Sequence, residues 1–416
     1  MRLVLRAARL IDGTGAPPRP EAAVLVAGDT IRGLHFGPTL PPAWQEGARL
    51  LDYPGCTLLP GLIDAHVHLV WGGTADPVGD LQRENNAHLL LRAADNARLA
   101  LFSGVTTVRD CGGRDDTTFV VRDALQRGLI PGPRLRVCGR PLTRPGGHCF
   151  FFHGEAEGVE GVRRAVAQLV AEGADFIKVM ATGGAMTPTT NPGEASYSLE
   201  ELQAIVEAAA AAGRTVAAHC HALAGIERAV TAGCQTIEHA SFLTPDRRVQ
   251  FEPRLAARLV ERGTYLVPTL AAGYHRARAL QRRPTRTPEE TRLLEMRARR
   301  LELFHRLYQM GARLVYGSDS GVTLTPFGEP LVGLRLLEQL GMPPLAVLHA
   351  ATGLAAAALD IADTVGTLAV GKKADLLVVA GDPSRDLGAL QQLRLVMLGG
   401  QVVVPHRPVH WQEPEG

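Results

Sequence analysis

The chain has 416 residues, of which 46% are hydrophobic and 21% are charged, and its formal net charge is +2. This length is sufficient for a large buried core, while the near-neutral charge excludes a global field that would attract nucleic acid or an anionic membrane. The sequence also contains no run of about 18 apolar residues, the length that a transmembrane helix needs.

Two features bear on the cellular compartment. The six cysteines include no Cys-x-x-Cys pair, so free thiols are the simplest interpretation. The N-terminal segment is interrupted by Arg2, Arg6 and Arg9 and lacks the apolar core of a signal peptide. We therefore expect a cytoplasmic protein with reduced cysteines.

The two ends of the chain resemble each other. Residues 1–57 and 356–416 contain short alternating or apolar segments that end in glycine or aspartate, as β-strands do. Neither end can close a core alone. We expect the two ends to pair in one small β-sandwich domain.

Residues 58–355 alternate strand-like and helix-like segments, a pattern that predicts an α/β fold with a parallel sheet. Their number fits a (β/α)8 TIM barrel, which needs about 250 residues or more. The eight expected strands carry or comprise, in chain order, His66 with His68, residues 105–108, residues 134–137, Lys178, His219, His239, residues 265–267, and Asp319. The polar landmarks then lie at or near strand C-terminal ends, where such barrels keep their active sites.

The first strand carries a His-x-His pair. His66 and His68 follow the apolar run after Pro60-Gly61, and residues two apart on a strand project to the same face. Two imidazoles aimed at one point make half of a metal site. A lone His-x-His is weak evidence, because paired histidines also occur as hydrogen-bonded polar groups of a core.

Lys178 lies in the apolar run from Ala174 to Ala181, although only three of the 44 basic residues are lysines. Arginine has replaced lysine almost everywhere that a positive charge suffices, so Lys178 is expected to matter for its amine. A buried strand disfavours the charged form of lysine, and a neutral amine reacts with carbon dioxide in ways that a guanidinium does not. The alternative is a lysine that extends from a strand end to water.

Further candidate ligands follow at the ends of later strands. His219 and His221 share one strand face, His239 ends the next apolar segment, and Asp319 precedes a glycine at the last strand. Each alone has an ordinary interpretation, as a core histidine or a helix cap. Together they are ligand types suited to hard or borderline metal ions.

These residues and their flanking segments resemble the amidohydrolase superfamily with a binuclear metal centre. The segments are "PGLIDAHVHL", "SGVTTVRDCGG", "IKVMATGG", "TIEHAS" and "GSDSG". They are similar to the imidazolonepropionase-like branch, which contains metal-dependent Xaa-Pro and Xaa-Arg dipeptidases and carboxypeptidase-like ochratoxin hydrolases. The resemblance covers almost the whole chain and implies a metal-dependent hydrolase of C–N bonds.

The resemblance implies two divalent metal ions, with Zn²⁺ the expected metal. In the family the lysine is carboxylated by carbon dioxide and its carbamate bridges the two ions, which would explain why Lys178 is not an arginine. The expected allocation is His66, His68 and Asp319 to one ion, His219 and His239 to the other, and carboxylated Lys178 as the bridge. Asp319 is the expected catalytic residue, because a carboxylate there can take a proton from the nucleophile and return it to the leaving amine.

Two more histidines are expected to bind substrate. His148 follows the third strand and resembles the family's substrate-binding histidine, with a solvated loop histidine as the alternative. His221 stands where dipeptidase relatives often have a tyrosine that contacts the substrate carboxylate, so the chain departs from the pattern there. Whether His219 or His221 is the metal ligand stays open. Residues 276–300 hold nine arginines against three glutamates, a pattern of a solvated helix or, alternatively, of a lid that attracts acidic groups.

The expected function is the release of a C-terminal amino acid from a dipeptide or an N-acyl amino acid, including amides of the ochratoxin type. Cyclic-amide hydrolysis of the imidazolonepropionase kind is an alternative, but those enzymes use a mononuclear site without the lysine. A catalytically inactive barrel that serves as an assembly module is another, but such proteins lose metal ligands that this sequence keeps. The expected partners are a small amide or dipeptide substrate and further copies of the chain, as a homo-oligomer.

Overall fold

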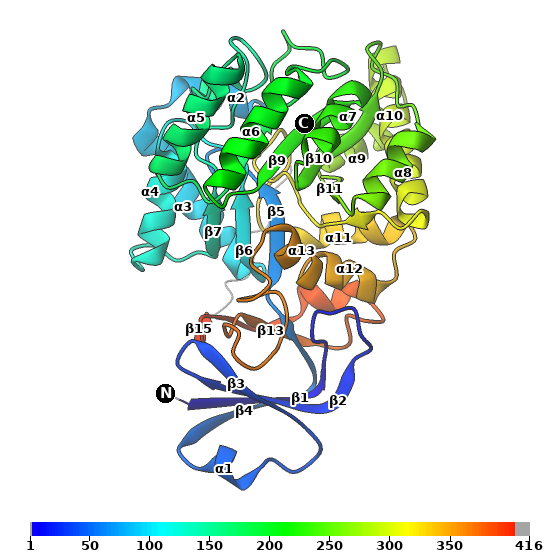
Figure 1. The fold of residues 1–416 in the computed structure, drawn as a ribbon. Coiled ribbons are helices and arrows are strands. Elements are labelled where there is room, and N and C mark those ends of the chain that lie inside the picture. The colour runs from blue at the N-terminus through cyan, green and yellow to red at the C-terminus, as the bar shows by residue number, and fades with distance from the viewer. Residues whose placement is uncertain (1, 404–416) are drawn as a thin grey trace.

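The structure is a computed structural model that describes residues 2–403. A sheet built from both ends of the chain forms its lower part, and a larger body of alternating strands and helices lies above it (Figure 1). None of the helices among the described residues has the length and apolar character needed to cross a membrane.

The lower part is one seven-stranded sheet with the strand order β15-β14-β13-β4-β1-β2-β3. In this sheet β4 pairs in parallel with β1 and antiparallel with β13, so it joins the N-terminal strands to the C-terminal ones. Its strands are β1 (Arg2–Leu10), β2 (Arg19–Ala27), β3 (Thr30–Phe36), β4 (Ala48–Pro60), β13 (Leu376–Ala380), β14 (Leu393–Leu398) and β15 (Gln401–Val403).

The two chain ends thus share one structural unit, as the sequence indicates. The predicted β-sandwich is not confirmed, because the described strands of both ends form a single continuous sheet. Residues 404–416, which the prediction also assigns to this unit, lie outside the described residues. The predicted division points fall within β4 and within helix α13, and the domain boundaries stay a prediction.

The upper part contains two parallel sheets, with the orders β5-β6-β7 and β12-β11-β10-β9-β8. Isolated parallel bridges between Val67 and Ser320 and between Leu142 and Val179 connect the two sheets at both edges. The strands are β5 (Leu62–Val67), β6 (Val105–Asp110), β7 (Arg134–Val137), β8 (Ile177–Met180), β9 (Val216–Ala222), β10 (Thr236–Leu243), β11 (Tyr265–Val267) and β12 (Arg313–Leu314). Parallel strands therefore occur in the expected order at the expected places in the chain, but β5 ends before His68 and β12 ends before Asp319.

Helices follow these strands and pack around them (Figure 1). The predicted Ser198 cap of α6 is present: its side chain accepts from the Glu201 N–H, and the Glu201 side chain accepts from the Ser198 N–H. The helices are α1 (Pro42–Gln45), α2 (Pro77–Arg83), α3 (Asn86–Phe102), α4 (Thr117–Gln126), α5 (Val159–Ala171), α6 (Leu199–Ala211), α7 (Leu223–Ala232), α8 (Pro253–Glu261), α9 (Tyr274–Arg282), α10 (Pro288–Gln309), α11 (Pro330–Gln339), α12 (Pro344–Ala350) and α13 (Gly353–Ala358), with 3-10 turns η1 (Phe150–Phe152) and η2 (Leu387–Gln391).

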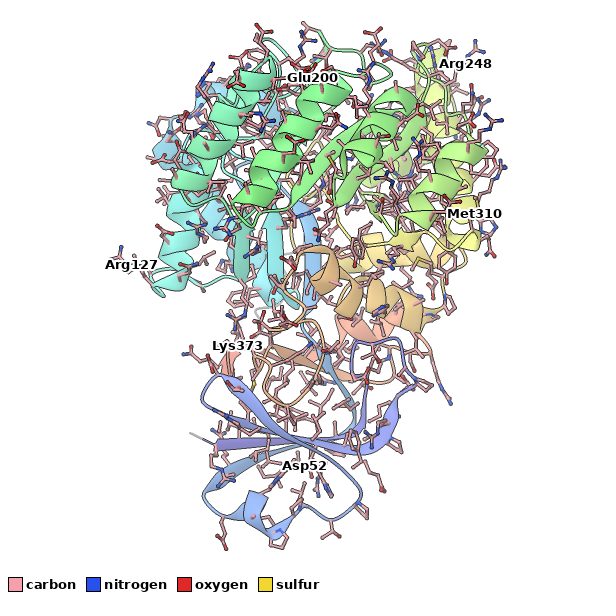
Figure 2. The ribbon with its side chains drawn as sticks, viewed as in Figure 1. Asp52, Arg127, Glu200, Arg248, Met310 and Lys373 are labelled. Carbon is pink, nitrogen blue, oxygen red and sulfur yellow. The ribbon has the colours of Figure 1, made fainter. Side chains whose placement is uncertain are left out.

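Lys178 differs from the other two lysines in its burial and its contacts. Lys373 lies near the boundary of the two parts and forms an ion pair with Asp29 (Figure 2). Lys372 donates to the Ala362 carbonyl. Lys178, in contrast, is only 1% exposed and lies on β8 inside the upper part.

Gly61 connects the terminal sheet to the strand that carries the His-x-His pair. It lies between β4 and β5, and its N–H donates to the Asp375 carbonyl over 3.0 Å. A Cβ added to Gly61 would lie 2.6 Å from the Cβ of Thr106 on β6, and closer still to the rest of that buried side chain. The absence of a side chain therefore allows β5 to pass against β6.

We predict that Gly61→Ala lowers the free energy of unfolding by about 1–3 kcal/mol or more, because overpacking displaces Thr106. Denaturant unfolding monitored by circular dichroism measures the change. Gly161→Ala is the matched control, because a Cβ there meets nothing within 4 Å and alanine favours its helix, α5. Equal stability of the two variants would contradict the close contact at Gly61.

Candidate active site

The residues singled out in the sequence meet at one cavity. The cavity has a volume of about 340 Å³ and lies at the C-terminal ends of the parallel strands. Its lining includes all eight of them: His66, His68, His148, Lys178, His219, His221, His239 and Asp319. Polar groups spread over most of the chain are thus brought to one point by the strand order.

One group consists of His66, His68 and Asp319. The Oδ1 atom of Asp319 lies 3.4 Å from Nε2 of His66 and 3.6 Å from Nε2 of His68. This Oδ1 atom is buried and has no hydrogen-bond partner in the described part of the chain. Two imidazole nitrogens and an unpartnered carboxylate oxygen therefore face a common point.

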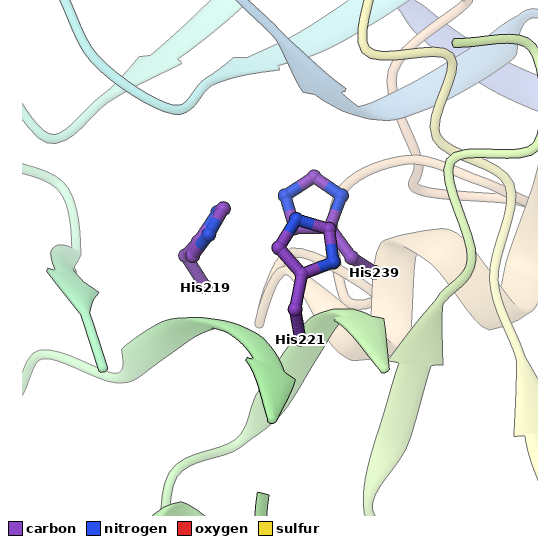
Figure 3. A group of neighbouring side chains, drawn as sticks. All are labelled: His219, His221 and His239. Carbon is purple, nitrogen blue, oxygen red and sulfur yellow. The ribbon is translucent and has the colours of Figure 1, made fainter. Parts of the chain in front are cut away.

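The other group consists of His219, His221 and His239, which project from β9 and β10 into the same space (Figure 3). Each offers a ring nitrogen within 4.8 Å of the others. The rings of His221 and His239 stack with centroids 4.6 Å apart, and the centroids of His219 and His239 are 4.5 Å apart. The geometry allows both His219 and His221 to act as ligands beside His239.

Each of these imidazoles is oriented by a contact to its other ring nitrogen. Such contacts fix the ring and leave the remaining nitrogen for a ligand. The contacts are His66 Nδ1 to Glu238 Oε2 (2.7 Å), His68 Nδ1 to the Gly112 carbonyl (3.0 Å), His219 Nε2 to the Gly183 carbonyl (3.1 Å), His221 Nδ1 to Ser241 Oγ (2.8 Å) and His239 Nδ1 to Thr269 Oγ1 (2.8 Å).

Burial favours the neutral form of the rings. It lowers the pKa well below the usual value for His68, His219, His221 and His239. Burial likewise lowers the pKa of His148 to about 3. A neutral imidazole retains the lone pair that binds a metal ion, so these five rings present acceptors and not cations at neutral pH.

Lys178 lies in the same cavity, where it forms no ion pair with a carboxylate of the described residues. Its side chain is among the largest fully buried ones. A buried ammonium without a paired carboxylate is costly. The position is therefore suited to an amine that reacts or is modified, as the sequence indicates.

Asp319 differs from the expectation that it ends a strand. β12 ends at Leu314, and Asp319 lies in the following loop with φ 61, in the left-handed region. Its N–H donates to the His66 carbonyl over 2.7 Å. This contact to β5, and not a strand ladder, holds the carboxylate beside His66.

His148 lines the cavity and is 4% exposed, so the alternative of a solvated loop histidine does not hold. Its ring centroid is 4.5 Å from that of His219, and its Nδ1 has no partner in the described part of the chain. The Sγ atom of Cys149 lies 3.4 Å from its Nε2. His148 is therefore available to contact a ligand beside the His219 group.

A buried ion pair behind His66 was not among the predictions from the sequence. Nη2 of Arg109 lies 2.6 Å from Oε1 of Glu238, whose other oxygen contacts His66. Burial alone would raise the pKa of Glu238, but the Arg109 charge and the His66 hydrogen bond hold that pKa well below its usual value. Both residues are charged groups within buried strands, the same signal that identified Lys178. Although Cys111, His66 and Glu238 also lie close together, Glu238 is already committed to Arg109.

Comparison with known proteins gives the family. The model of the Amidohydrolase family matches residues 57–403. The chain belongs to the amidohydrolase family. This confirms the resemblance predicted from the motifs, and the amidohydrolase is a hydrolase acting on amide bonds.

Individual relatives of this amidohydrolase agree with that assignment. It is 30% identical to ochratoxinase of Aspergillus niger over 428 residues, covering 94% of this chain and 84% of the relative. It is 26% identical to imidazolonepropionase of Deinococcus radiodurans over 398 residues, covering 88% and 87%. A crystal structure of a Xaa-Pro dipeptidase with methionine bound in its active site superposes with a TM-score of 0.85 at 28% identity, covering 97% of this chain and 100% of that one.

We predict that Glu238→Gln destabilises the amidohydrolase by about 3 kcal/mol or more, because it leaves the Arg109 guanidinium buried without its carboxylate. Thermal or denaturant unfolding measures the loss. Glu227→Gln is the control, since Glu227 is exposed and pairs with Arg258 over 3.5 Å at the surface. Similar stabilities for the two variants would show that the Arg109–Glu238 pair is not structurally important.

Proposed function

We propose that this amidohydrolase is a binuclear metal-dependent enzyme that releases a C-terminal amino acid from a dipeptide or an N-acyl amino acid, at the C-terminal end of a closed (β/α)8 barrel. The observation that carries the proposal is the buried Lys178 amine, which forms no ion pair within residues 2–403 and shares one cavity with histidines and Asp319. The relatives named ochratoxinase and Xaa-Pro dipeptidase, the latter with bound methionine, support a substrate with an amino acid on one side of the amide.

The donor set fits a pair of divalent ions. His66, His68 and Asp319 would hold one ion and His219 and His239 the other, with the carboxylated Lys178 amine shared between them. The unpartnered Oδ1 of Asp319 and the free ring nitrogens are the atoms such ions need. Imidazole and carboxylate ligands suit Zn²⁺, which we propose as the metal.

Bound ions supply Lewis acidity to the scissile carbonyl and to the water that attacks it. The chain's own residues do the remaining work. Asp319 accepts a proton from the attacking water and returns it to the leaving nitrogen of the amide. Burial raises the pKa of Asp319, whereas the neighbouring His66 and Lys178 charges oppose this shift, so its carboxyl group is placed to exchange a proton.

Two further histidines of the cavity are proposed to orient the substrate. His148 and His221 both line it, and His148 has a ring nitrogen without a partner in residues 2–403. We assign them to the free carboxylate of the substrate, and keep His219 as the metal ligand of β9. The cytoplasmic location and the homo-oligomeric state stay predictions; the six cysteines are buried and free of disulfides.

We predict that Lys178→Arg loses bound metal and at least about 100-fold in activity, because a guanidinium cannot become a carbamate. Metal content per chain, measured by elemental analysis after zinc loading, should fall from two ions. Lys373→Arg is the matched control, since it keeps its surface ion pair with Asp29 and should retain both ions. Full metal content and full activity in Lys178→Arg would overturn the binuclear proposal.

We predict that Asp319→Asn lowers kcat by about 100-fold or more while the fold survives, because the amide keeps the shape of the side chain but cannot exchange the proton. Rates on a dipeptide are compared at measured metal content, so that a lost ion is not mistaken for a lost base. Asp95→Asn, at an exposed site paired with Arg98, should behave as the unmodified enzyme. An unchanged rate in fully metallated Asp319→Asn would assign the proton transfer to another group.

A further inference from the structure

One face of helix α10 forms a wall of the cavity. Leu293, Met296, Arg297 and Arg300 all line it, and their spacing places them on the same side of the helix. Arg299 of the same helix lines a different groove at the surface. The arginine-rich stretch is therefore divided, and only part of it faces the active site.

The two α10 arginines of the cavity have no carboxylate partner. Neither Arg297 nor Arg300 takes part in an ion pair within residues 2–403, although the chain forms many Arg–carboxylate pairs at its surface. Burial lowers the pKa of Arg297 and, together with the nearby Arg297 charge, lowers the pKa of Arg300 to about 10. Both guanidinium groups still carry charge at neutral pH. Uncompensated positive charge in a partly buried wall is costly unless a ligand supplies the anion.

The two arginines differ in their free hydrogen-bonding capacity. Arg297 uses both terminal nitrogens on backbone carbonyls, with Nη1 3.1 Å from Ala272 O and Nη2 2.8 Å from Leu270 O. Arg300 uses only Nη2, which lies 2.9 Å from Pro268 O. Its Nε is buried without a partner, and its Nη1 makes no hydrogen bond in the described part of the chain. Nη1 is thus unused, and Nη2 has a second hydrogen beyond its contact with Pro268, so the Nη1–Nη2 edge has the donors for a paired contact.

Arg300 also lies close to the histidines of the site. Arg300 lines the same cavity as His219, His221 and Asp319. The guanidinium is therefore near the reacting centre but is no part of the donor groups that would hold metal.

We propose that Arg300 is the specificity-determining residue that binds the free carboxylate of the leaving amino acid, in addition to His148 and His221. This inference rests on the proposed function. The planar guanidinium matches a carboxylate with two parallel hydrogen bonds, a geometry that an imidazole cannot provide. Leu293 and Met296 lie on the same face of α10, so the leaving amino acid that fits this wall is one with an apolar side chain.

The test compares an N-acyl apolar amino acid with its carboxamide, using zinc-loaded enzyme. Unmodified enzyme should prefer the acid by about 100-fold in kcat/KM, the scale of a lost charge-assisted contact. Arg300→Met should reduce that preference to about 10-fold or less, mainly through a higher KM for the acid, and should weaken inhibition by the free amino acid by a similar factor. Metal content should not change.

Two further variants separate charge from geometry. Arg300→Lys keeps the charge but loses the paired donors, so we expect an intermediate preference. Arg299→Met removes an exposed charge of the same helix outside the cavity and should leave preference and inhibition unchanged.

The outcomes are distinguishable. If the unmodified enzyme cleaves acid and amide equally, the proposed function fails, and this inference with it. If it prefers the acid and Arg300→Met keeps that preference, or loses activity on both substrates alike, the role of Arg300 is wrong and the proposed function stands. If Arg300→Met does not fold, Arg300→Lys decides in the same way, because an unchanged acid preference in that variant overturns the role.

Discussion

The active site depends on charged groups that are stable in the interior only because they are paired. Arg109 on β6, Glu238 on β10 and His66 on β5 form a continuous buried chain of contacts at 2.6 and 2.7 Å. It joins strands of both parallel sheets, because β5 and β6 belong to one and β10 to the other. Since Glu238 occupies Nδ1 of His66, the opposite nitrogen is directed to the cavity. The orientation of the His66 ring is thus set by an ion pair whose two residues do not line the cavity.

The Asp64 carboxylate fixes the strand ends around the His66 ring, and several residues there have strained backbone conformations. Asp64 accepts hydrogen bonds from the backbone N–H of His66 and Ser318, which ties β5 to the loop that carries Asp319. His239, Thr269 and Asp319 are not glycines, yet all have φ between 49 and 65. Such conformations cost about 1–3 kcal/mol each and persist where surrounding contacts determine them. The strained backbone therefore lowers the stability of the fold at these strand ends, where the side chains of the cavity converge.

The cavity separates two kinds of chemistry. One part of its lining consists of imidazoles, the Lys178 amine and Asp319, all supplied by the parallel strands and their following loops. Its wall on α10 presents guanidinium groups and apolar side chains. In our proposal, the parallel strands and their loops supply the reacting groups, while helix α10 selects which amide binds. The reaction and the substrate selectivity then depend on different elements, so substitutions can alter one without the other.

Local sequence patterns predict much of the strand order and of the candidate site. The period of two on a strand places His66 beside His68, and the rarity of lysine identifies Lys178 before any coordinates are known. Short apolar or alternating segments likewise predicted the parallel strands, including residues 134–137 and 265–267. The contacts of Glu238 with Arg109, the loop position of Asp319 and the orientation of Arg300 join segments far apart in the chain, so no local period encodes them. The single sheet shared by both chain ends and the presence of both His219 and His221 beside His239 are also seen only in the tertiary structure. Side-chain direction across a fold depends on how strands close around a common interior, and that closure is a property of the whole packed chain.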